Sequence, residues 1–242
     1  MGETPVGETP YTVLSCCISL DGFLDDRTVT RLVLSSPGDL ERVDSLRAGS
    51  DAILVGAGTV RADNPRLAVR DATRRAERRA AGRTATPLRV TVTRSGELDP
   101  RSAFFATDDD EKLVYCPDAT RVAIRGHHSA ATTVVGCGAD VDLAWVLADL
   151  GTRGVQRLVV EGGQSVLTQL LTAGLANELQ LAVAPVFVGD SGAPRFVGDG
   201  AFPWMSPHRA RLREVRQCGD TALLHYQLTP RCRTVPVEKT FS

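Results

Sequence analysis

Residues 51–70 read DAILVGAGTVRADNPRLAVR and run from an apolar stretch, through two glycines, into a group of polar side chains. Ile53-Leu54-Val55 is a short apolar run bounded by turn residues, which predicts an interior strand. Gly56 and Gly58 carry no Cβ, so the backbone there can approach a ligand closely. Polar residues then share one loop, in which Asn64-Pro65 is a turn signal. The segment predicts a ligand-binding loop at the end of a buried strand.

Outward from this segment, apolar strand-like runs alternate with helix-like stretches along most of the chain. That alternation favours an α/β layered architecture over a helix bundle or a β-sandwich. Apolar residues at helical spacing predict an amphipathic helix over residues 142–153, packed on the sheet. Gly219-Asp220 predicts a tight antiparallel hairpin between the last two strands. The expected strands cover residues 12–18, 88–92, 112–116, 132–135, 158–160, 212–218 and 222–228.

Two further segments predict a helix and an exposed stretch. Ser36-Pro37-Gly38-Asp39 has an N-cap serine, a first-turn proline and an acid three residues on, which is typical of a helix start. That helix is expected to carry Leu40, Val43 and Leu46-Arg47 toward the strand described above. The arginine- and alanine-rich residues 74–83 indicate a solvated helix or a surface loop. No function is assigned to them.

The chain has 242 residues and no Pro/Gly/Ser-rich linker, which predicts one folded domain over residues 11–230. Residues 1–10 contain Gly-Glu-Thr-Pro twice and are expected to be a disordered tail, as are residues 231–242 at the C-terminus. A formal net charge of -1 and a pI near 6.4 disfavour nucleic acids and anionic membranes as partners. The chain has no membrane-length apolar stretch and no signal-peptide pattern, so a cytoplasmic location is expected.

Several common catalytic and metal-binding patterns are missing from the sequence. His127-His128 lacks a carboxylate or cysteine at ligand spacing, so no metal site is predicted. The chain contains neither the G-x-S-x-G elbow of serine hydrolases nor the zinc deaminase signature. Without any C-x-x-C pair, the six cysteines are expected to be reduced core thiols. They are Cys16, Cys17, Cys116, Cys137, Cys218 and Cys232.

A second glycine turn follows the expected strand at residues 158–160. Glu161-Gly162-Gly163-Gln164-Ser165 opens a helix, whose free N–H groups and positive dipole end can bind a diphosphate. From these residues alone, a plain turn is also open. The standard G-x-G-x-x-G and P-loop patterns are absent. Arg94 follows the expected strand at residues 88–92. Its guanidinium could bind a ribose 2′-phosphate, which would select NADPH, but an ordinary strand end is an equal alternative.

Four blocks in register resemble the reductase domain of riboflavin biosynthesis. They are residues 51–70, Ser19-Leu20-Asp21-Gly22, Leu46-Arg47-Ala48 and Val160-Glu161-Gly162-Gly163, and the turn at residues 184–189 adds to them. The resemblance covers roughly residues 11–228. It implies a dihydrofolate-reductase-like, three-layer α/β fold, with a mostly parallel central sheet, helices on both faces and a C-terminal antiparallel hairpin. It also implies that residues 11–230 are a reductase domain without the deaminase domain that precedes it in bifunctional enzymes.

The resemblance implies NADPH-dependent reduction of a 5-amino-6-ribosylaminopyrimidine 5′-phosphate, from ribosyl to ribityl, by a homodimer. The implied cofactor-binding residues are Cys17, Val33, Thr59, Asp63, Arg94, Gly162, Gly163, Gln164, Ser165, Val166 and Leu167. The implied substrate-binding residues are Arg47, Leu67, Arg70 and Glu161. Asp21 is the candidate proton donor. Carboxylic acids can deliver the proton that this reduction needs.

Alternatives stay open at several of these positions. Asp21 could serve an Asp-Gly turn, Arg47 could be a helix C-terminal cation and Arg70 a surface residue. The chain has residues 31–36, Arg-Leu-Val-Leu-Ser-Ser, where family members often carry Trp-Ile-Thr-Ser. That difference leaves a dihydropterin or a specialised-metabolite pyrimidine open as the substrate, as well as a non-catalytic ligand-binding relic. It is also open whether the pyrimidine has been deaminated.

Overall fold

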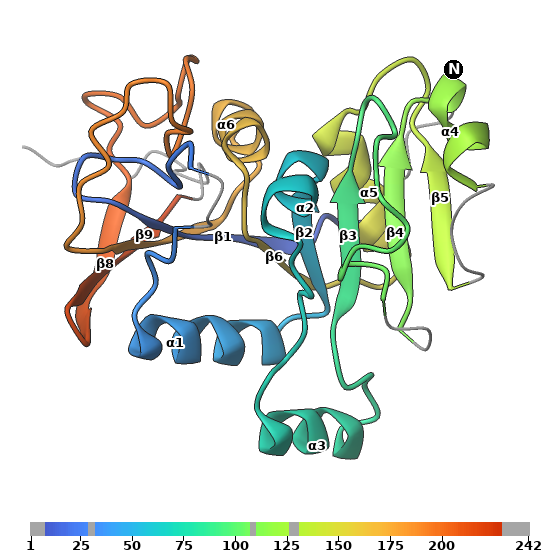
Figure 1. Cartoon of the computed structure of the whole chain (residues 1–242), viewed down its shortest axis with the longest axis horizontal. Coiled ribbons are helices and arrows are strands. Elements are labelled where there is room, and N and C mark those ends of the chain that lie inside the picture. The colour runs from blue at the N-terminus through green and yellow to red at the C-terminus, as the bar shows by residue number, and fades with distance from the viewer. Residues whose placement is uncertain (1–7, 29–31, 107–109, 126–130, 229–242) are drawn as a thin grey trace, which may run out of the picture.

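The computed structural model describes residues 8–28, 32–106, 110–125 and 131–228 of the chain. Within them lies a nine-stranded sheet in the order β5-β4-β3-β2-β6-β1-β7-β9-β8 (Figure 1). The strands are β1 Tyr11–Ile18, β2 Ala52–Gly56, β3 Leu88–Val92, β4 Lys112–Cys116, β5 Thr132–Gly136, β6 Arg157–Val160, β7 Glu178–Val183, β8 Arg211–Cys218 and β9 Thr221–Gln227.

The strands from β5 to β7 pair in parallel, and β9 and β8 close the sheet as an antiparallel hairpin. Gly219 has φ +69° in the turn of that hairpin, a conformation that favours glycine. The predicted fold class, a mostly parallel α/β sheet with a C-terminal hairpin, is therefore confirmed.

Helices cover both faces of the sheet, so the β2 strand is buried throughout. On one face, Leu54 and Val90 belong to a core with α5 and α6. On the other, Ile53 and Val55 pack with α2 and α4. In Figure 1, α1 lies on one side of the sheet and α6 on the other, with α3 beyond α1. The helices are α1 Pro37–Ala48, α2 Ala57–Asp63, α3 Ala72–Ala80, α4 Asp118–Arg125, α5 Leu143–Thr152 and α6 Gln164–Thr172.

Helix α1 begins as predicted but buries only part of the face that was expected. The Ser36 hydroxyl accepts a hydrogen bond from the backbone N–H of Asp39, so Ser36 is the N-cap. Of the residues expected to face the strand at residues 52–56, Leu46 packs against the core that holds Ile53 and Val55 and Arg47 is buried, whereas Leu40 and Val43 are only half-buried. The fully buried side chains of α1 are instead charged, and each has a charged or polar partner: Asp39, Arg42, Asp44 and Arg47.

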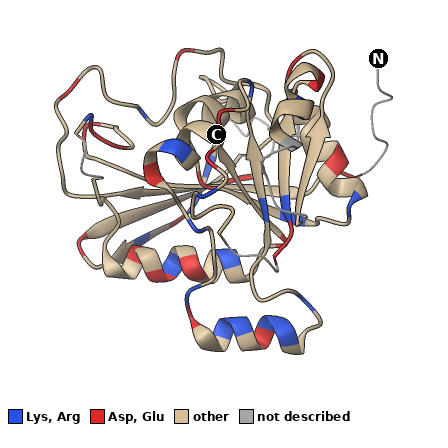
Figure 2. Ribbon diagram, turned by 45° about the vertical axis from the view of Figure 1, so that its right-hand side comes forward, with Lys and Arg blue, Asp and Glu red and all other residues tan. Residues whose placement is uncertain are grey.

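The arginine-rich segment is also less solvent-facing than its composition indicates. Residues 72–80 form α3, which packs on α1, and charged residues gather on both helices (Figure 2). Arg78 is 5 % exposed and donates to the carbonyls of Ala48, Ser50 and Thr84. Burial lowers the pKa of Arg78 to about 10, with the nearby Arg83 adding to that effect. The helix is therefore part of the folded domain.

The described cysteines are free thiols. Cys16, Cys116 and Cys218 are buried and Cys17 and Cys137 are half-buried, all as free thiols. Cys232, His127-His128 and most of the two expected tails lie outside the described residues.

Among the described residues, no helix has the length and apolar character needed to cross a membrane. That part of the chain also holds no cluster of three or more His, Cys, Asp or Glu side chains suited to a metal ion.

Candidate active site

The carboxyl ends of the adjacent strands β2, β6 and β1 open on a cleft of about 1120 Å³. Ligands of open parallel sheets bind at this end of the strands, where the connecting loops diverge. Three predicted site residues do not line the cleft, namely Asp21, Arg94 and Leu167. Those that do are Cys17, Val33, Arg47, Thr59, Asp63, Leu67, Arg70, Glu161, Gly162, Gly163, Gln164, Ser165 and Val166.

The glycine turn after β6 is packed against the end of β2. The Gly56 N–H donates to the Gly162 carbonyl at 3.0 Å, and the Gly162–Gly163 peptide bond is cis. Gly162 has φ +123°, a conformation that side chains rarely adopt. A Cβ on Gly163 would lie 2.9 Å from the Thr59 hydroxyl oxygen. Both glycines are therefore required by the shape of this turn.

Helix α6 begins at this turn with its N-terminus at the cleft. Its N-cap is Gly163, which makes no side-chain cap hydrogen bond, and its first turn contains no acidic residue. Gln164, Ser165 and Val166 line the cleft, whereas Leu167 is fully buried in the core. Exposed N–H groups at the positive end of a helix dipole suit an anion such as a diphosphate. The cradle fits the predicted dinucleotide, but Leu167 can support it only by packing.

The remaining cofactor candidates lie around this turn. Thr59 and Asp63 come from α2 and reach the cleft beside Gly163. Cys17 lies near the end of β1, where burial raises the pKa of its thiol to about 11, so that it is a neutral, weakly nucleophilic lining group. Val33 is 68 % exposed, which leaves an apolar surface available to a flat ring.

Arg47 and Glu161 form a two-point ion pair across the cleft floor. Arg47 Nε lies 2.7 Å from Glu161 Oε1, and Arg47 Nη2 lies 2.6 Å from Oε2. The side chains are 11 % and 12 % exposed. Burial alone would lower the pKa of Arg47, but the carboxylate outweighs it and the pKa is raised. The pair joins α1 to the glycine turn and leaves lone pairs of the carboxylate for a ligand.

The loop after α2 forms one wall of the cleft. Leu67 is 2 % exposed with φ +50°, and its side chain packs in the core. Arg47 Nη1 donates to the Ala68 carbonyl at 3.0 Å, so the Arg47–Glu161 pair also touches this wall. The Arg70 side chain is exposed at the cleft. This position favours a ligand-binding role for Arg70 over that of a plain surface residue.

Sequence reasoning missed a second charged pair, formed by Asp39 and Arg42. Arg42 Nε lies 2.8 Å from Asp39 Oδ1, and Arg42 Nη1 reaches Ser15 of β1 and Gln180 of β7. Asp39, Arg42 and Ser15 all border the cleft. The sequence signal that could have found this pair is the i,i+3 spacing of Asp39 and Arg42 on the predicted helix.

Asp21 lies outside the cleft and binds the loop that follows β7. Its carboxylate accepts from the Ser19 hydroxyl at 2.6 Å and from the backbone N–H groups of Val188 and Gly189. The Ser19 hydrogen bond is the largest of the effects that lower the pKa of Asp21 to about 2. A carboxylate that is ionised and engaged in this way is a poor proton donor. The catalytic assignment of Asp21 is therefore withdrawn in favour of the turn alternative.

Arg94 follows β3 at the same edge of the sheet, beyond the lining of the cleft. Its Nε lies 2.9 Å from Asp140 Oδ1, and the two side chains are 70 % and 59 % exposed. Exposed ion pairs of this kind contribute at most about 1 kcal/mol to stability. Arg94 can therefore exchange Asp140 for a phosphate at little cost.

A sequence profile of the RibD C-terminal domain matches residues 10–224. The chain belongs to the RibD C-terminal domain family. A curated relative from Archaeoglobus fulgidus, named 2,5-diamino-6-ribosylamino-4(3H)-pyrimidinone 5′-phosphate reductase, is 34 % identical over 87 % of this chain and 94 % of its own. A relative of the same name from Methanothermobacter thermautotrophicus is 30 % identical over 90 % and 97 %. These relatives are reductases, which places the chain among the oxidoreductases.

Solved structures of the RibD type share the fold. A bifunctional deaminase/5-amino-6-(5-phosphoribosylamino)uracil reductase from Thermotoga maritima superposes with a TM-score of 0.74 at 21 % identity. The match covers 90 % of this chain and 56 % of that one. A pyrimidine reductase-like protein from Corynebacterium diphtheriae gives a TM-score of 0.72 at 21 % identity, covering 94 % of both chains. These likenesses support the α/β fold predicted from the sequence, with a mostly parallel sheet and C-terminal antiparallel strands.

In a RibD C-terminal domain with this geometry, Asp21→Asn should keep kcat within a factor of about three of the unchanged protein. The physical reason is that Asp21 caps a loop and transfers no proton. Its folded-state pKa is depressed, so its stabilising effect is present above its ordinary pKa of 3.8 and is lost as pH falls toward about 2. Thermal melts of the two proteins should therefore differ at neutral pH and converge in strong acid. A hundredfold loss of kcat would restore the proton-donor assignment.

Proposed function

We propose that this chain is an NADPH-dependent reductase that converts 2,5-diamino-6-ribosylamino-4(3H)-pyrimidinone 5′-phosphate to its ribityl product. The observation that carries the proposal is the position of Glu161. Its carboxylate is held by Arg47 on the cleft floor, and the next two residues are the glycines that shape the α6 N-terminus. A pyrimidine bound at Glu161 and a dinucleotide bound at α6 would therefore meet in one cleft. The two relatives that match over almost their full length carry this substrate in their names.

Residues of two helices and a turn would hold the cofactor. The N–H groups of Gln164, Ser165 and Val166 suit the diphosphate, while Thr59 and Asp63 approach from the other side. Cys17 and Val33 offer apolar surface near the end of β1. When bound, NADPH would supply a hydride to the substrate. Holding the hydride donor and acceptor in register accounts for most of what the protein contributes to such a reaction.

Substrate recognition would use the opposite end of the cleft. Glu161 can accept hydrogen bonds from the amino groups of a diaminopyrimidine, since each carboxylate oxygen has lone pairs beyond those used by Arg47. Arg70 presents an exposed guanidinium that matches phosphate oxygens. Leu67 is buried, so it can support this end of the cleft only by packing in the core beneath it. The arrangement suits a planar amine-rich ring that is joined to a phosphorylated sugar.

The proposed reduction adds one hydride to C1′ of the sugar and one proton to the oxygen that leaves C1′ when the ribosyl ring opens. The low exposure of Arg47 and Glu161 keeps water away from the floor of the cleft, where the ring would bind. We assign the proton to a donor other than Asp21. Its carboxylate is occupied at the loop after β7.

Steady-state oxidation of NADPH tests the proposal directly. The diaminopyrimidine ribosyl phosphate, its deaminated counterpart and dihydrofolate would be compared as substrates. We expect kcat/KM to be highest for the diamino compound, because Glu161 pairs with amino groups. A higher kcat/KM for the deaminated ring would mean that the chain is a uracil reductase. Turnover of dihydrofolate alone would mean that the proposed pyrimidine is not the substrate. If NADPH does not raise the melting temperature, a non-catalytic relic is favoured.

The preference for NADPH over NADH is expected to depend on Arg94. Replacing Arg94 with alanine should raise the KM for NADPH about tenfold and leave the KM for NADH unchanged, because only NADPH carries the 2′-phosphate. Asp140→Asn is the matched control, since it removes the other half of the same ion pair. That variant should bind NADPH at least as well as the unchanged protein. Equal effects of Arg94→Ala on both cofactors would contradict the assignment.

The homodimer stays a prediction from the family resemblance, and the cytoplasmic location stays a prediction from the sequence. Sedimentation at several protein concentrations would measure the first, and a mass of one chain throughout would contradict it.

A further inference from the structure

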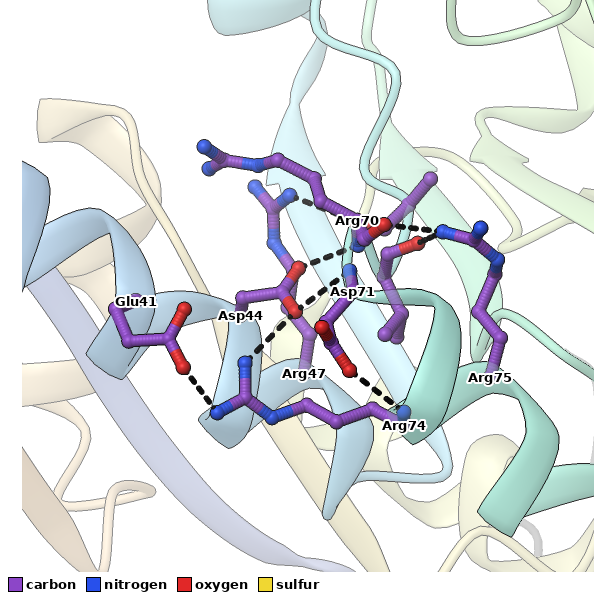
Figure 3. A network of polar contacts seen from close by, with 9 residues as sticks. Glu41, Asp44, Arg47, Arg70, Asp71, Arg74 and Arg75 are labelled. Carbon is purple, nitrogen blue, oxygen red and sulfur yellow. Dashed lines mark hydrogen bonds and ion pairs between the residues drawn. The ribbon is translucent and has the colours of Figure 1, made fainter.

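The wall of the cleft at residues 64–71 has no regular secondary structure, yet charged side chains hold its backbone (Figure 3). Those side chains come from α1 and from α3, the arginine-rich helix to which the sequence assigned no function. Fixing the backbone of an irregular segment costs conformational entropy at every residue. The contacts around Arg70 therefore order its backbone before a ligand binds.

Asp44 of α1 binds the backbone on one side of the segment. Its side chain is 3 % exposed, and Oδ1 accepts from the Arg70 N–H. Its Oδ2 accepts from the Asp71 N–H and from Arg74 Nη1, each at 3.1 Å. Burial raises the pKa of Asp44, but these hydrogen bonds outweigh it and the pKa is lowered. The buried carboxylate is thus matched to two consecutive N–H groups of the wall.

Arg75 of α3 binds the same segment through its carbonyls. Its Nη1 donates to the carbonyls of Val69, at 3.0 Å, and Arg70. Arg74, one residue earlier, ties α3 to α1 by ion pairs with Glu41 and Asp44. Figure 3 shows Asp44 and Arg75 approaching the Arg70 backbone from different sides. The N–H and the C=O of Arg70 are therefore both held by side chains.

The Arg70 side chain, in contrast, is exposed at the cleft and takes no part in this network through its guanidinium, as far as the described residues show. In Figure 3 it extends to the side of the wall on which the Arg47 guanidinium lies. A fixed backbone with an unengaged guanidinium is the arrangement expected of a preorganised anion-binding residue. The conformational entropy of the backbone is then lost during folding and not on ligand binding.

We propose that Asp44 and α3, through Arg74 and Arg75, form a clamp that positions Arg70 for the phosphate group of the substrate. Asp44 and Arg75 are positioning residues, since they act through the backbone of Arg70. Arg75 also borders the cleft, but its Nη1 is engaged by the carbonyls of Val69 and Arg70. The inference rests on the proposed function, in which Arg70 binds the phosphate. It assigns a role to the α3 segment that its composition does not indicate.

Two variants test the clamp by kinetics. Asp44→Asn and Arg75→Gln should each raise the KM for the pyrimidine phosphate about tenfold, while kcat and the KM for NADPH change less than about twofold. Arg79→Gln is the matched control, because it removes one positive charge from the exposed side of the same helix. It should change none of these constants. Equal losses in all three variants would show a general charge effect and overturn the proposal.

A double-mutant cycle with Arg70→Ala separates positioning from general stability. If Asp44 acts through Arg70, adding Asp44→Asn to Arg70→Ala should raise the KM less than about twofold further. A full additional tenfold increase would mean that Asp44 acts independently, and the clamp would be rejected. Arg75→Gln carries the same cycle if the buried Asp44 variant fails to fold, since Arg75 is only half-buried.

Amide hydrogen exchange tests the clamp without any turnover. In Asp44→Asn and Arg75→Gln, the amides of Arg70 and Asp71 should exchange at least about tenfold faster, with the α5 and α6 amides unchanged. Exchange at the unchanged rate in both variants would overturn the proposal. If the unchanged protein does not reduce the pyrimidine, the proposed function fails, and calorimetric binding of ribose 5-phosphate replaces KM as the readout. Equal affinity of the unchanged protein and Arg75→Gln for that probe would then reject the clamp.

Discussion

Glu161→Gln should lower kcat/KM for the pyrimidine phosphate by about tenfold to a hundredfold, because the amide loses one acceptor oxygen and a hydrogen bond to a charged group contributes about 1.5–3 kcal/mol. The amide keeps the size of the carboxylate but has only one acceptor oxygen. In the unchanged protein, both oxygens already serve Arg47, at 2.7 and 2.6 Å. The substitution therefore disturbs the ring contact and the floor of the cleft together.

The same variant should lose stability, since Arg47 would remain buried opposite a neutral partner. Breaking a buried ion pair costs about 3–5 kcal/mol. Thermal melts at neutral pH measure this loss, and kinetics at a temperature well below the melt measure the catalytic one. Glu97→Gln, on an exposed loop, is the matched control and should change neither. A Glu161→Gln protein that keeps kcat/KM within a factor of about three would remove Glu161 from the substrate site.

Gly163→Ala should raise the KM for NADPH by about tenfold to a hundredfold. The added Cβ would lie 2.9 Å from the Thr59 hydroxyl oxygen, so either Thr59 or the α6 N-terminus must move. Such overpacking typically costs about 1–3 kcal/mol. Both groups that would have to move belong to the predicted cofactor cradle. Titration of NADPH followed by its fluorescence would measure the loss as a change in Kd.

The control for this variant is Gly49→Ala at the end of α1. Gly49 has φ -81°, and its added Cβ would meet nothing closer than 3.7 Å, so the protein should bind NADPH normally. Unchanged NADPH affinity in Gly163→Ala would mean that the cofactor does not use this turn. The α6 assignment would then have to be abandoned, even if the protein is a reductase.

Local patterns were sufficient for the secondary structure that builds the site. The apolar run at residues 53–55 is in β2, the Ser36 cap begins α1, and Gly219-Asp220 turns the last hairpin. Each of these depends on a few neighbouring residues, through periodicity, capping or turn geometry. The glycine turn after β6 belongs to the same group, because its shape is set by residues adjacent in the chain.

Local patterns failed where a side chain is matched to a distant one. The inward face of α1 buries Asp44, whose carboxylate accepts hydrogen bonds from backbone N–H groups 26 and 27 positions away. Asp21 was expected to donate a proton, yet its carboxylate binds N–H groups 167 and 168 positions away. Burying a charge is tolerated only when such partners exist, and no window of sequence contains them.

The sequence by itself determined the α/β fold, the two glycine turns and the membership of the RibD C-terminal domain family. Only the tertiary structure decided which polar groups meet. Arg47 reaches Glu161 across 114 positions because β6 lies next to β2 in the sheet, and Asp44 reaches Arg70 because α3 packs on α1. Strand order and helix packing set those distances, and the strength of a buried ion pair depends on distance and burial rather than on spacing along the chain.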